Sequence, residues 1–308
     1  MEILVAKHAG FCFGVKKAIQ MAEEVASENS GKTYVYGQLV HNEKVISDLE
    51  KKGLVFVDNI NDIPENAVTV LRAHGEPGTT YQLLQQKSIT KESSLKDATC
   101  PLVTLVHNVV IKLRNNGYEV IIFGKPNHPE SIGTSYHIKG NNTFIVSDAS
   151  DFQSAISYIK KHNFDKVAIV SQTTMSVDGY KKLIENINQN FHQKFEEIPL
   201  SLDKLNIKYG YVDTICKPTK QRQFDTEEIA KQSDVVIVVG GKNSSNTKEL
   251  YYKCKEFGVE AYFVQSGHQL QKEWFIGKHK VGVTAGASTP DEVINNTIQR
   301  IKEIDKEL

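Results

Sequence analysis

The chain of 308 residues has few cysteines and lacks the motifs that mark the commonest cofactor sites. Its four cysteines, Cys12, Cys100, Cys216 and Cys254, lie far apart, and none belongs to a C-x-x-C pair. That absence excludes the usual structural-zinc and thioredoxin-like redox signatures. The sequence also has no G-x-x-x-x-G-K-[ST] loop and no G-x-G-x-x-G fingerprint, so it predicts neither a P-loop nucleotide site nor a dinucleotide site.

Charge and hydrophobicity exclude further classes of protein. Lys plus Arg and Asp plus Glu number 37 each, so no basic field favours nucleic acid as a partner. The longest uninterrupted apolar run, Val235 to Val239, is far below the roughly 20 residues of a membrane span. The amino terminus lacks the apolar region of a signal peptide. We therefore expect a cytoplasmic protein with neither membrane nor nucleic acid as a partner.

Three segments of the chain share one plan. In each, a β-rich run leads to a cysteine, a helical pattern follows, and a strand then ends at a glycine. The cysteines are Cys12, Cys100 and Cys216, and the strand-end glycines are Gly37, Gly124 and Gly240. The cysteines and the glycines recur with spacings that agree to within one residue. The three cysteines thus occupy equivalent positions, whereas Cys254, in the helical pattern KELYYKCKEF, falls outside the plan.

Each segment carries two further polar loops at strand ends. The loop after the glycine holds His41 in the first segment, His128 and Glu130 in the second, and Ser244, Ser245 and Asn246 in the third. A later loop holds His74, Thr173 and Ser288, respectively. The last of these loops continues as Thr289-Pro290-Asp291-Glu292, which we interpret as a capping box with proline at the first helical position.

Strands that alternate with helical patterns indicate parallel βαβ units, and such sheets bind ligands at the carboxyl ends of their strands. We predict an α/β fold of three pseudo-repeated βαβ-type units with parallel sheets, arranged as a trefoil around a central cluster where the three cysteines converge. The predicted units are residues 1–98, 99–198 and 199–308, the last with a C-terminal helix. The alternative places residues 1–13 with the third unit.

The residue types suggest two kinds of ligand. Three thiolates suit a soft metal or an iron–sulfur cluster, and they leave one metal position open. Hydroxyl, amide and imidazole groups at helix N-termini can bind a phosphate group without lysine or arginine. The anion-binding candidates are His41, His74, His128, Thr173, Ser244, Ser245, Asn246 and Ser288, and Glu130 is the one carboxylate among the loops.

At these residues the sequence resembles the 4-hydroxy-3-methylbut-2-enyl diphosphate reductase family of isoprenoid biosynthesis. The resemblance spans nearly the whole chain and is carried by the motifs AGFCFGVKKAI, QLVHN, RAHG, DATCPLVT, NHPE, SQTT, TIC with a later RQ, KNSSNT and GAS.

The resemblance implies a three-domain trefoil with one [4Fe-4S] cluster, held by Cys12, Cys100 and Cys216, whose fourth iron is open to substrate. It implies that His41, His74, His128, Ser244, Ser245, Asn246 and Ser288 bind the diphosphate, and that Glu130 and Thr173, beside His128, handle the substrate hydroxyl group and its proton. The implied reaction is a two-electron reductive dehydroxylation that gives isopentenyl and dimethylallyl diphosphates. The electrons would come from a separate ferredoxin or flavodoxin, because no flavin or NAD signature is present.

Two other classes of function remain open at this stage. One is a non-catalytic iron–sulfur sensor, in which the polar loops have no catalytic role. The other is a hydrolase in which three thiolates and a water molecule bind zinc.

Overall fold

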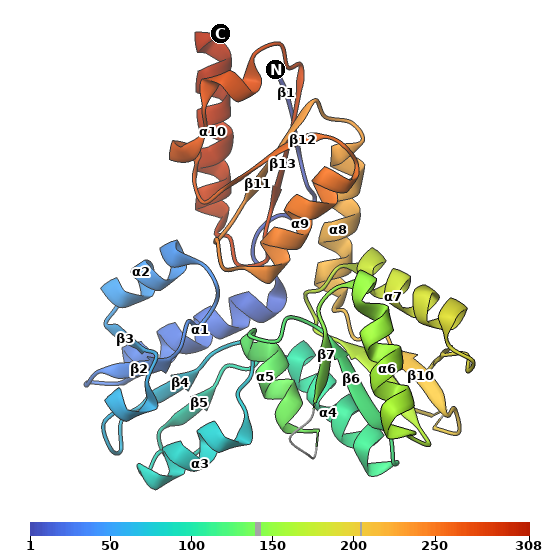
Figure 1. Cartoon of the computed structure of the whole chain (residues 1–308). Coiled ribbons are helices and arrows are strands. Elements are labelled where there is room, and N and C mark those ends of the chain that lie inside the picture. Colours follow the sequence, from blue (N-terminus) through green and yellow to red (C-terminus); the bar gives the residue numbers. More distant parts are fainter. Residues whose placement is uncertain (139–142, 204) are drawn as a thin grey trace. The chain divides into compact units, whose positions relative to one another are not determined.

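The computed structural model describes residues 1–138, 143–203 and 205–308 as an α/β fold with three parallel sheets (Figure 1). The predicted fold class and its parallel sheets are therefore confirmed. The α-helices are α1 (Phe13–Glu28), α2 (Glu43–Lys51), α3 (Gly78–Gln86), α4 (Pro101–Asn115), α5 (Pro129–Tyr136), α6 (Phe152–His162), α7 (Val177–Asn190), α8 (Lys217–Ala230), α9 (Ser245–Glu256) and α10 (Asp291–Glu307). Short 3-10 helices are η1 (Ile60–Asp62), η2 (Ala149–Asp151), η3 (Gly267–Gln269) and η4 (Lys272–Phe275).

The three sheets share one strand order. The first sheet runs β3 (Leu54–Val57), β2 (Thr33–Tyr36), β4 (Thr69–Leu71) and β5 (Leu95–Asp97). The second runs β7 (Phe144–Val146), β6 (Glu119–Phe123), β8 (Val167–Ser171), β10 (Tyr209–Val212) and β9 (Glu196–Glu197). The third runs β12 (Glu260–Val264), β11 (Val235–Val239), β13 (Lys280–Ala285) and β1 (Glu2–Val5).

In every sheet, the strand that leads to a cysteine pairs with the strand that ends at the last polar loop of the preceding repeat, and the first repeat follows the third in this respect. β5, which precedes Cys100, pairs with β4; β10, which precedes Cys216, pairs with β8; and β1, which precedes Cys12, pairs with β13. β1 thus lies in the sheet of the third repeat, and Val212 of β10 is buried in a core of the second sheet. The unit boundaries stay a prediction.

The burial of the central strands shows that the parallel sheets are covered by helices on both faces. All five residues of β11 are buried, as expected for a strand between two layers of helices. Val235, Ile237 and Val239 face the core beneath α10, while Val236 and Val238 face the core beneath α8 and α9 (Figure 1). The second sheet is built likewise, with α6 and α7 over one face and α4 over the other.

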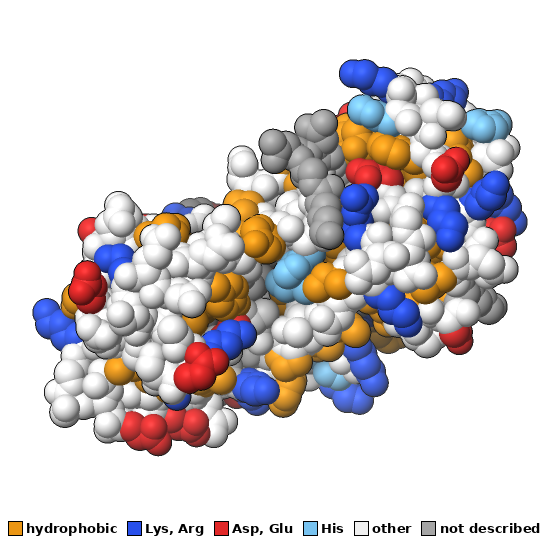
Figure 2. Space-filling model, turned by 90° about the horizontal axis from the view of Figure 1, so that it is seen from below, with side chains coloured by type: hydrophobic (Ala, Val, Ile, Leu, Met, Phe, Trp, Pro, Cys, Tyr) orange, Lys and Arg blue, Asp and Glu red, His pale blue; other side chains and the backbone are white. Residues whose placement is uncertain are grey.

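By its internal contacts the chain divides into two compact bodies. Body 1 comprises Met1–Ser30, Gln38–Phe56 and Lys217–Leu308, and body 2 comprises Gly31–Gly37 and Val57–Cys216. Positively and negatively charged side chains are interspersed over the face shown in Figure 2, in keeping with the equal numbers of cationic and anionic residues. Within the described residues, no helix has both the length and the apolar character needed to cross a membrane.

The predicted capping box before the last helix is wrong. α10 begins at Asp291, and Pro290 is its N-cap, without a side-chain capping bond. The hydroxyl group of Thr289 instead donates to the carbonyl oxygen of Val239, at 3.1 Å. Because Pro290 is the N-cap, Thr289 lies one residue before the cap position, and its side chain does not cap the helix.

Candidate functional site

The three equivalent cysteines all stand where a helix begins. Cys12 is the N-cap of α1 and its Sγ accepts the N–H of Val15 at 3.5 Å. Cys100 is the N-cap of α4, and Cys216 directly precedes α8. All three are partly exposed, whereas Cys254 is fully buried. Burial raises the pKa of the Cys254 thiol to about 12, which leaves it an inert core residue.

One backbone hydrogen bond recurs at each of these cysteines. The N–H of the cysteine donates to a carbonyl oxygen in the last polar loop of the same sheet. The bonds join Cys12 to Ala287 at 3.1 Å, Cys100 to Ala73 at 2.9 Å, and Cys216 to Thr173 at 3.1 Å. Two of the acceptors immediately precede His74 and Ser288, and the third is itself a predicted site residue. Each cysteine is thereby held in register with one candidate substrate-binding residue.

In body 2, Glu130 lies in the first turn of α5 and is 1% exposed. The backbone N–H of Thr173 donates to its Oε1 at 2.6 Å, and the Thr173 hydroxyl group donates to its Oε2 at 2.8 Å. Burial raises the pKa of the Glu130 carboxyl to about 7, although the two hydrogen bonds oppose the shift. A carboxyl group with a pKa near neutrality is well suited to general acid catalysis.

His128 adjoins this carboxyl group and has a defined tautomer. It is the N-cap of α5, and its Nδ1 accepts the N–H of Glu130 at 3.2 Å. The proton of the neutral ring must therefore be on Nε2. The ring of His74 lies edge to face with that of His128, with centroids 5.4 Å apart. Body 2 thus presents two imidazoles beside the Glu130–Thr173 pair.

In body 1, a chain of hydrogen bonds links Asn246 to Cys12. Asn246 Oδ1 accepts the N–H of Ala287 at 3.0 Å, and the carbonyl oxygen of Ala287 accepts the N–H of Cys12. The Asn246 amide nitrogen also faces Thr219 Oγ1, at 3.5 Å. Asn246 is 3% exposed, whereas Ala287 and Cys12 are partly exposed. The start of α9 and the cysteine loop are therefore fixed to each other.

The other predicted residues of body 1 surround this connection. Ser244 is the N-cap of α9 and accepts the N–H of Thr247 at 3.2 Å, and Ser245 begins the helix. The Ser288 hydroxyl group donates to the carbonyl oxygen of His41 at 3.1 Å. A Cβ atom on Gly241 would lie 2.3 Å from that same carbonyl oxygen, so only glycine allows the His41 loop to approach so closely.

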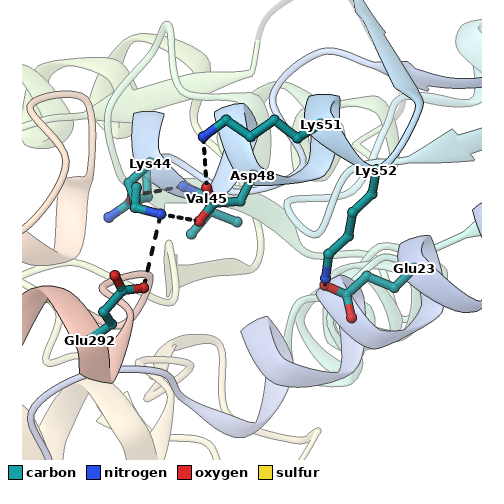
Figure 3. Close-up of polar contacts among 8 residues, drawn as sticks. Glu23, Lys44, Val45, Asp48, Lys51, Lys52 and Glu292 are labelled. Atoms are coloured by element: carbon teal, nitrogen blue, oxygen red, sulfur yellow. Dashed lines mark hydrogen bonds and ion pairs between the residues drawn. The ribbon is translucent and has the colours of Figure 1, made fainter.

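Surface ion pairs contribute little to the placement of His41. In Figure 3, Lys44 of α2 lies 2.5 Å from Asp48 and 4.0 Å from Glu292, and Lys52 lies 2.7 Å from Glu23. These side chains are substantially exposed, and exposed pairs stabilise by roughly 0 to 1 kcal/mol. The close approach at Gly241 and the Ser288 bond are the main constraints on this loop.

Sequence reasoning missed two residues that hold the loops in place. Gln172 accepts the N–H of Lys125 at 3.0 Å and the Ser131 hydroxyl at 3.2 Å, and so ties the Glu130 loop to the Thr173 loop. Arg222 donates from its guanidinium group to the carbonyl oxygen of Gly10, near Cys12. Both residues lie within quoted motifs, SQTT and RQ. Gln172 is 2% exposed and Arg222 is 4% exposed, and this burial of long polar side chains is a signal that only the structure provides.

Comparisons with known proteins agree with this architecture. The chain matches the LytB protein family over residues 3–302. It is 37% identical over 306 residues to the 4-hydroxy-3-methylbut-2-enyl diphosphate reductase of Aquifex aeolicus, covering 99% of this chain and 97% of that one. The reductase of the same name from Nautilia profundicola is 39% identical, covering 99% of this chain and all of the relative.

Solved structures give the same result. The fold is similar to that of the E-1-hydroxy-2-methyl-but-2-enyl-4-diphosphate reductase from Plasmodium falciparum, with a TM-score of 0.84, 29% identity, and coverage of 97% of this chain and 87% of that one. It is also similar to a structure of (E)-4-hydroxy-3-methyl-but-2-enyl diphosphate reductase, with a TM-score of 0.63, 36% identity, and coverage of 98% and 100%. The family resemblance predicted from the sequence is confirmed, and this chain belongs to the LytB protein family.

Proposed function

We propose that this protein is an oxidoreductase of isoprenoid biosynthesis, a 4-hydroxy-3-methylbut-2-enyl diphosphate reductase. Two electrons and two protons convert the allylic alcohol diphosphate and release its hydroxyl group as water, which gives isopentenyl and dimethylallyl diphosphates. Family membership favours this activity over a sensor or a zinc hydrolase. The observation that carries the proposal is the buried Glu130 carboxyl group, held by Thr173 beside two imidazoles in the same body.

The cofactor of the proposed reaction is a [4Fe-4S] cluster with Cys12, Cys100 and Cys216 as ligands and a fourth iron without a protein ligand. The donor set fits such a group, because soft metals prefer thiolates and a helix start favours the thiolate form. The backbone N–H of each cysteine is already bonded to a neighbouring loop, which fixes the side chain's point of attachment. When bound, the cluster supplies electrons and a Lewis-acidic iron. This ligation requires the predicted trefoil of three α/β units.

The diphosphate group binds to His41, His74, His128, Ser244, Ser245, Asn246 and Ser288. His128 in its neutral form carries its proton on Nε2, since its Nδ1 is the acceptor of a backbone bond. Ser244 and Ser245 lie at the start of α9, where the helix dipole and N–H groups favour an anion. The Ser288 hydroxyl group has one proton, which it now gives to the His41 carbonyl oxygen. It must turn from that carbonyl to donate to a phosphate oxygen.

Glu130 supplies the proton that converts the departing hydroxyl group into water. When the Glu130 carboxyl group is neutral, Oε1 still accepts the Thr173 N–H, so the proton is on Oε2 and the hydrogen bond between Oε2 and the Thr173 hydroxyl group reverses its direction. Thr173 accepts that proton and donates its own to the substrate oxygen, which lets a fully buried acid act on a ligand outside its own cavity. Burial holds the carboxyl pKa near 7, so a large fraction of Glu130 is protonated at neutral pH.

Anaerobic purification followed by iron, sulfide and zinc analysis tests the proposed function. The purified protein is then titrated with the allylic alcohol diphosphate while the visible spectrum is recorded, and turnover is measured with a chemical reductant. We expect an iron–sulfur spectrum that changes on addition of the diphosphate, and product formation. A protein that holds only zinc would support a hydrolase. A cluster that is indifferent to the diphosphate would support a sensor.

A further inference from the structure

The exposed face of α1 is basic and carries an aromatic side chain. Phe13, Lys16, Lys17 and Gln20 are all exposed, and their spacing of i, i+3, i+4 and i+7 places them on one side of the helix. Phe13 is 65% exposed, although it directly follows Cys12. A large apolar ring in water beside a candidate cofactor ligand contributes nothing to the core of the chain.

The exposed face of α8 has the same composition. Lys217, Lys220, Gln221 and Phe224 again follow the i, i+3, i+4 and i+7 spacing on one side of the helix. Phe224 is 63% exposed and Lys217 is exposed, while Lys220 and Gln221 are half-buried. α8 directly follows Cys216, as α1 directly follows Cys12.

The helix α8 contacts the loop that leads to Cys12, through residues next to its exposed face. His8 Nδ1 lies 2.8 Å from Asp225 of α8, and Arg222 of α8 donates to the carbonyl oxygen of Gly10. α8 therefore packs against the residues that immediately precede α1, within body 1. We call the eight residues of the two faces the basic–aromatic surface.

The positions of these lysines are unfavourable for the helices themselves. The positive end of a helix dipole is at its N-terminus, where cations are disfavoured. Neither α1 nor α8 has an acidic residue in its first turn. Within the described part of the chain, Lys16, Lys17 and Lys217 form no ion pair. Cationic side chains such as these three, on helix faces that each carry an exposed aromatic ring, are typical of a surface that attracts an acidic protein.

We propose that the basic–aromatic surface is the docking site of a small acidic flavodoxin-type electron carrier. The proposal rests on the proposed reductase function, which needs an external one-electron donor. The lysines complement the acidic surface of such a carrier, and Phe13 and Phe224 match the apolar edge of its exposed flavin ring. Docking here places the carrier next to the Cys12 loop, where electrons must enter.

The test compares two double charge reversals in the cluster-containing protein. Lys16→Glu with Lys17→Glu changes the proposed surface. Lys302→Glu with Lys306→Glu is the matched control, because these lysines are also exposed and in body 1 but lie on α10. Affinity for oxidised flavodoxin and the rate of cluster reduction by reduced flavodoxin are measured at low and high salt. Dithionite replaces flavodoxin in a parallel series.

We expect the surface variant to lose about tenfold or more in flavodoxin affinity and reduction rate at low salt. The loss should shrink at high salt, the control should stay within about twofold of the parent, and dithionite should reduce all three proteins equally. Lys16→Gln with Lys17→Gln should show a smaller loss in the same direction, and it replaces the charge reversal if that variant does not fold. Phe224→Ser should lower flavodoxin affinity at both salt concentrations.

Two results would overturn the docking proposal. One is equal flavodoxin affinity in the parent and the surface variant, including the case in which a ferredoxin but not flavodoxin responds to the charge change. The other is an equal loss with dithionite, which would give the lysines a role at the cluster. Failure of the reductase function itself is distinguishable, since the parent would then bind flavodoxin but would not convert the allylic diphosphate with dithionite.

Discussion

One residue, Thr173, makes both hydrogen bonds to the carboxylate of Glu130, through its backbone N–H and through its hydroxyl group. The carbonyl oxygen of Thr173 also accepts the N–H of Cys216. The proposed proton donor and a proposed cluster ligand are thus bonded to the same residue, although Glu130 and Cys216 belong to different repeats of the sequence. The Thr173 loop therefore couples the positions of Glu130 and Cys216.

Replacement of Glu130 by Gln should remove most turnover and leave the cluster absorbance intact. The amide cannot donate a proton at neutral pH, and general acid catalysis typically contributes about 10²- to 10⁴-fold. Steady-state rates with a chemical reductant and visible spectra provide the measurement. Glu197→Gln, at an exposed position, is the control. Unchanged activity in Glu130→Gln would refute the assignment of Glu130 as the proton donor.

The pH dependence of stability should reveal the buried acid. Because the Glu130 pKa is raised to about 7 in the folded protein, folding favours its protonated form. Its contribution is fully present below the unfolded pKa of about 4.5 and is lost as pH rises through the folded pKa, an effect of at most about 3 kcal/mol. The free energy of unfolding should therefore decrease more between pH 5 and pH 8 in the parent than in Glu130→Gln. Identical slopes would show that Glu130 titrates normally.

The cysteines should divide into two classes. Cys12→Ser, Cys100→Ser and Cys216→Ser should each lower iron retention, whereas Cys254→Ser should not, because its thiol is enclosed in the core. Iron and sulfide per chain after anaerobic purification give the measurement. Equal iron content in all four variants would contradict the proposed ligand set.

Replacement of Asn246 and replacement of His41 should affect iron retention differently, although both residues are proposed to bind the diphosphate. His41→Ala should weaken diphosphate binding and leave iron retention unchanged. Asn246→Ala should also weaken binding, and in addition it removes the acceptor that fixes Ala287 and, through it, Cys12. We expect faster release of iron to a chelator from Asn246→Ala alone. Equal release rates in the two variants would mean that the hydrogen-bond chain does not hold Cys12.

A methyl group at Gly241 should displace the His41 loop. The added Cβ would lie 2.3 Å from the His41 carbonyl oxygen, a contact that backbone movement alone can relieve. Gly241→Ala should lower both the melting temperature and the affinity for the diphosphate. Gly133→Ala is the matched control, since its Cβ would have ordinary contacts at 3.4 Å and beyond. A Gly241→Ala variant as stable as Gly133→Ala, with unchanged affinity, would show that the loop tolerates the shift.

Local patterns predicted the elements that carry the candidate site. The run around Val235 to Val239 is β11, and the helical pattern from Leu102 to Leu113 lies within α4. The equivalence of the three cysteines also appears as three helix starts. These features depend on periodicity and turn chemistry over a few residues, which a sequence contains directly.

The pairing of distant segments did not follow from those patterns. β10 follows the second repeat in the sequence and pairs with β8, because its Val212 is buried in a core of the second sheet. Burial of apolar surface thus decides the pairing of this strand. Thr289 precedes the N-cap Pro290 and makes no capping bond to α10.

The sequence by itself determined the three repeats, the family and the set of candidate site residues, since motif and spacing are properties of a linear chain. Only the tertiary structure decided that Thr173 holds Glu130, that Asn246 connects to Cys12 through Ala287, and that each cysteine strand joins the preceding sheet. Those relations arise from hydrogen bonds between residues far apart in sequence. They exist only after folding has excluded water from the groups that form them.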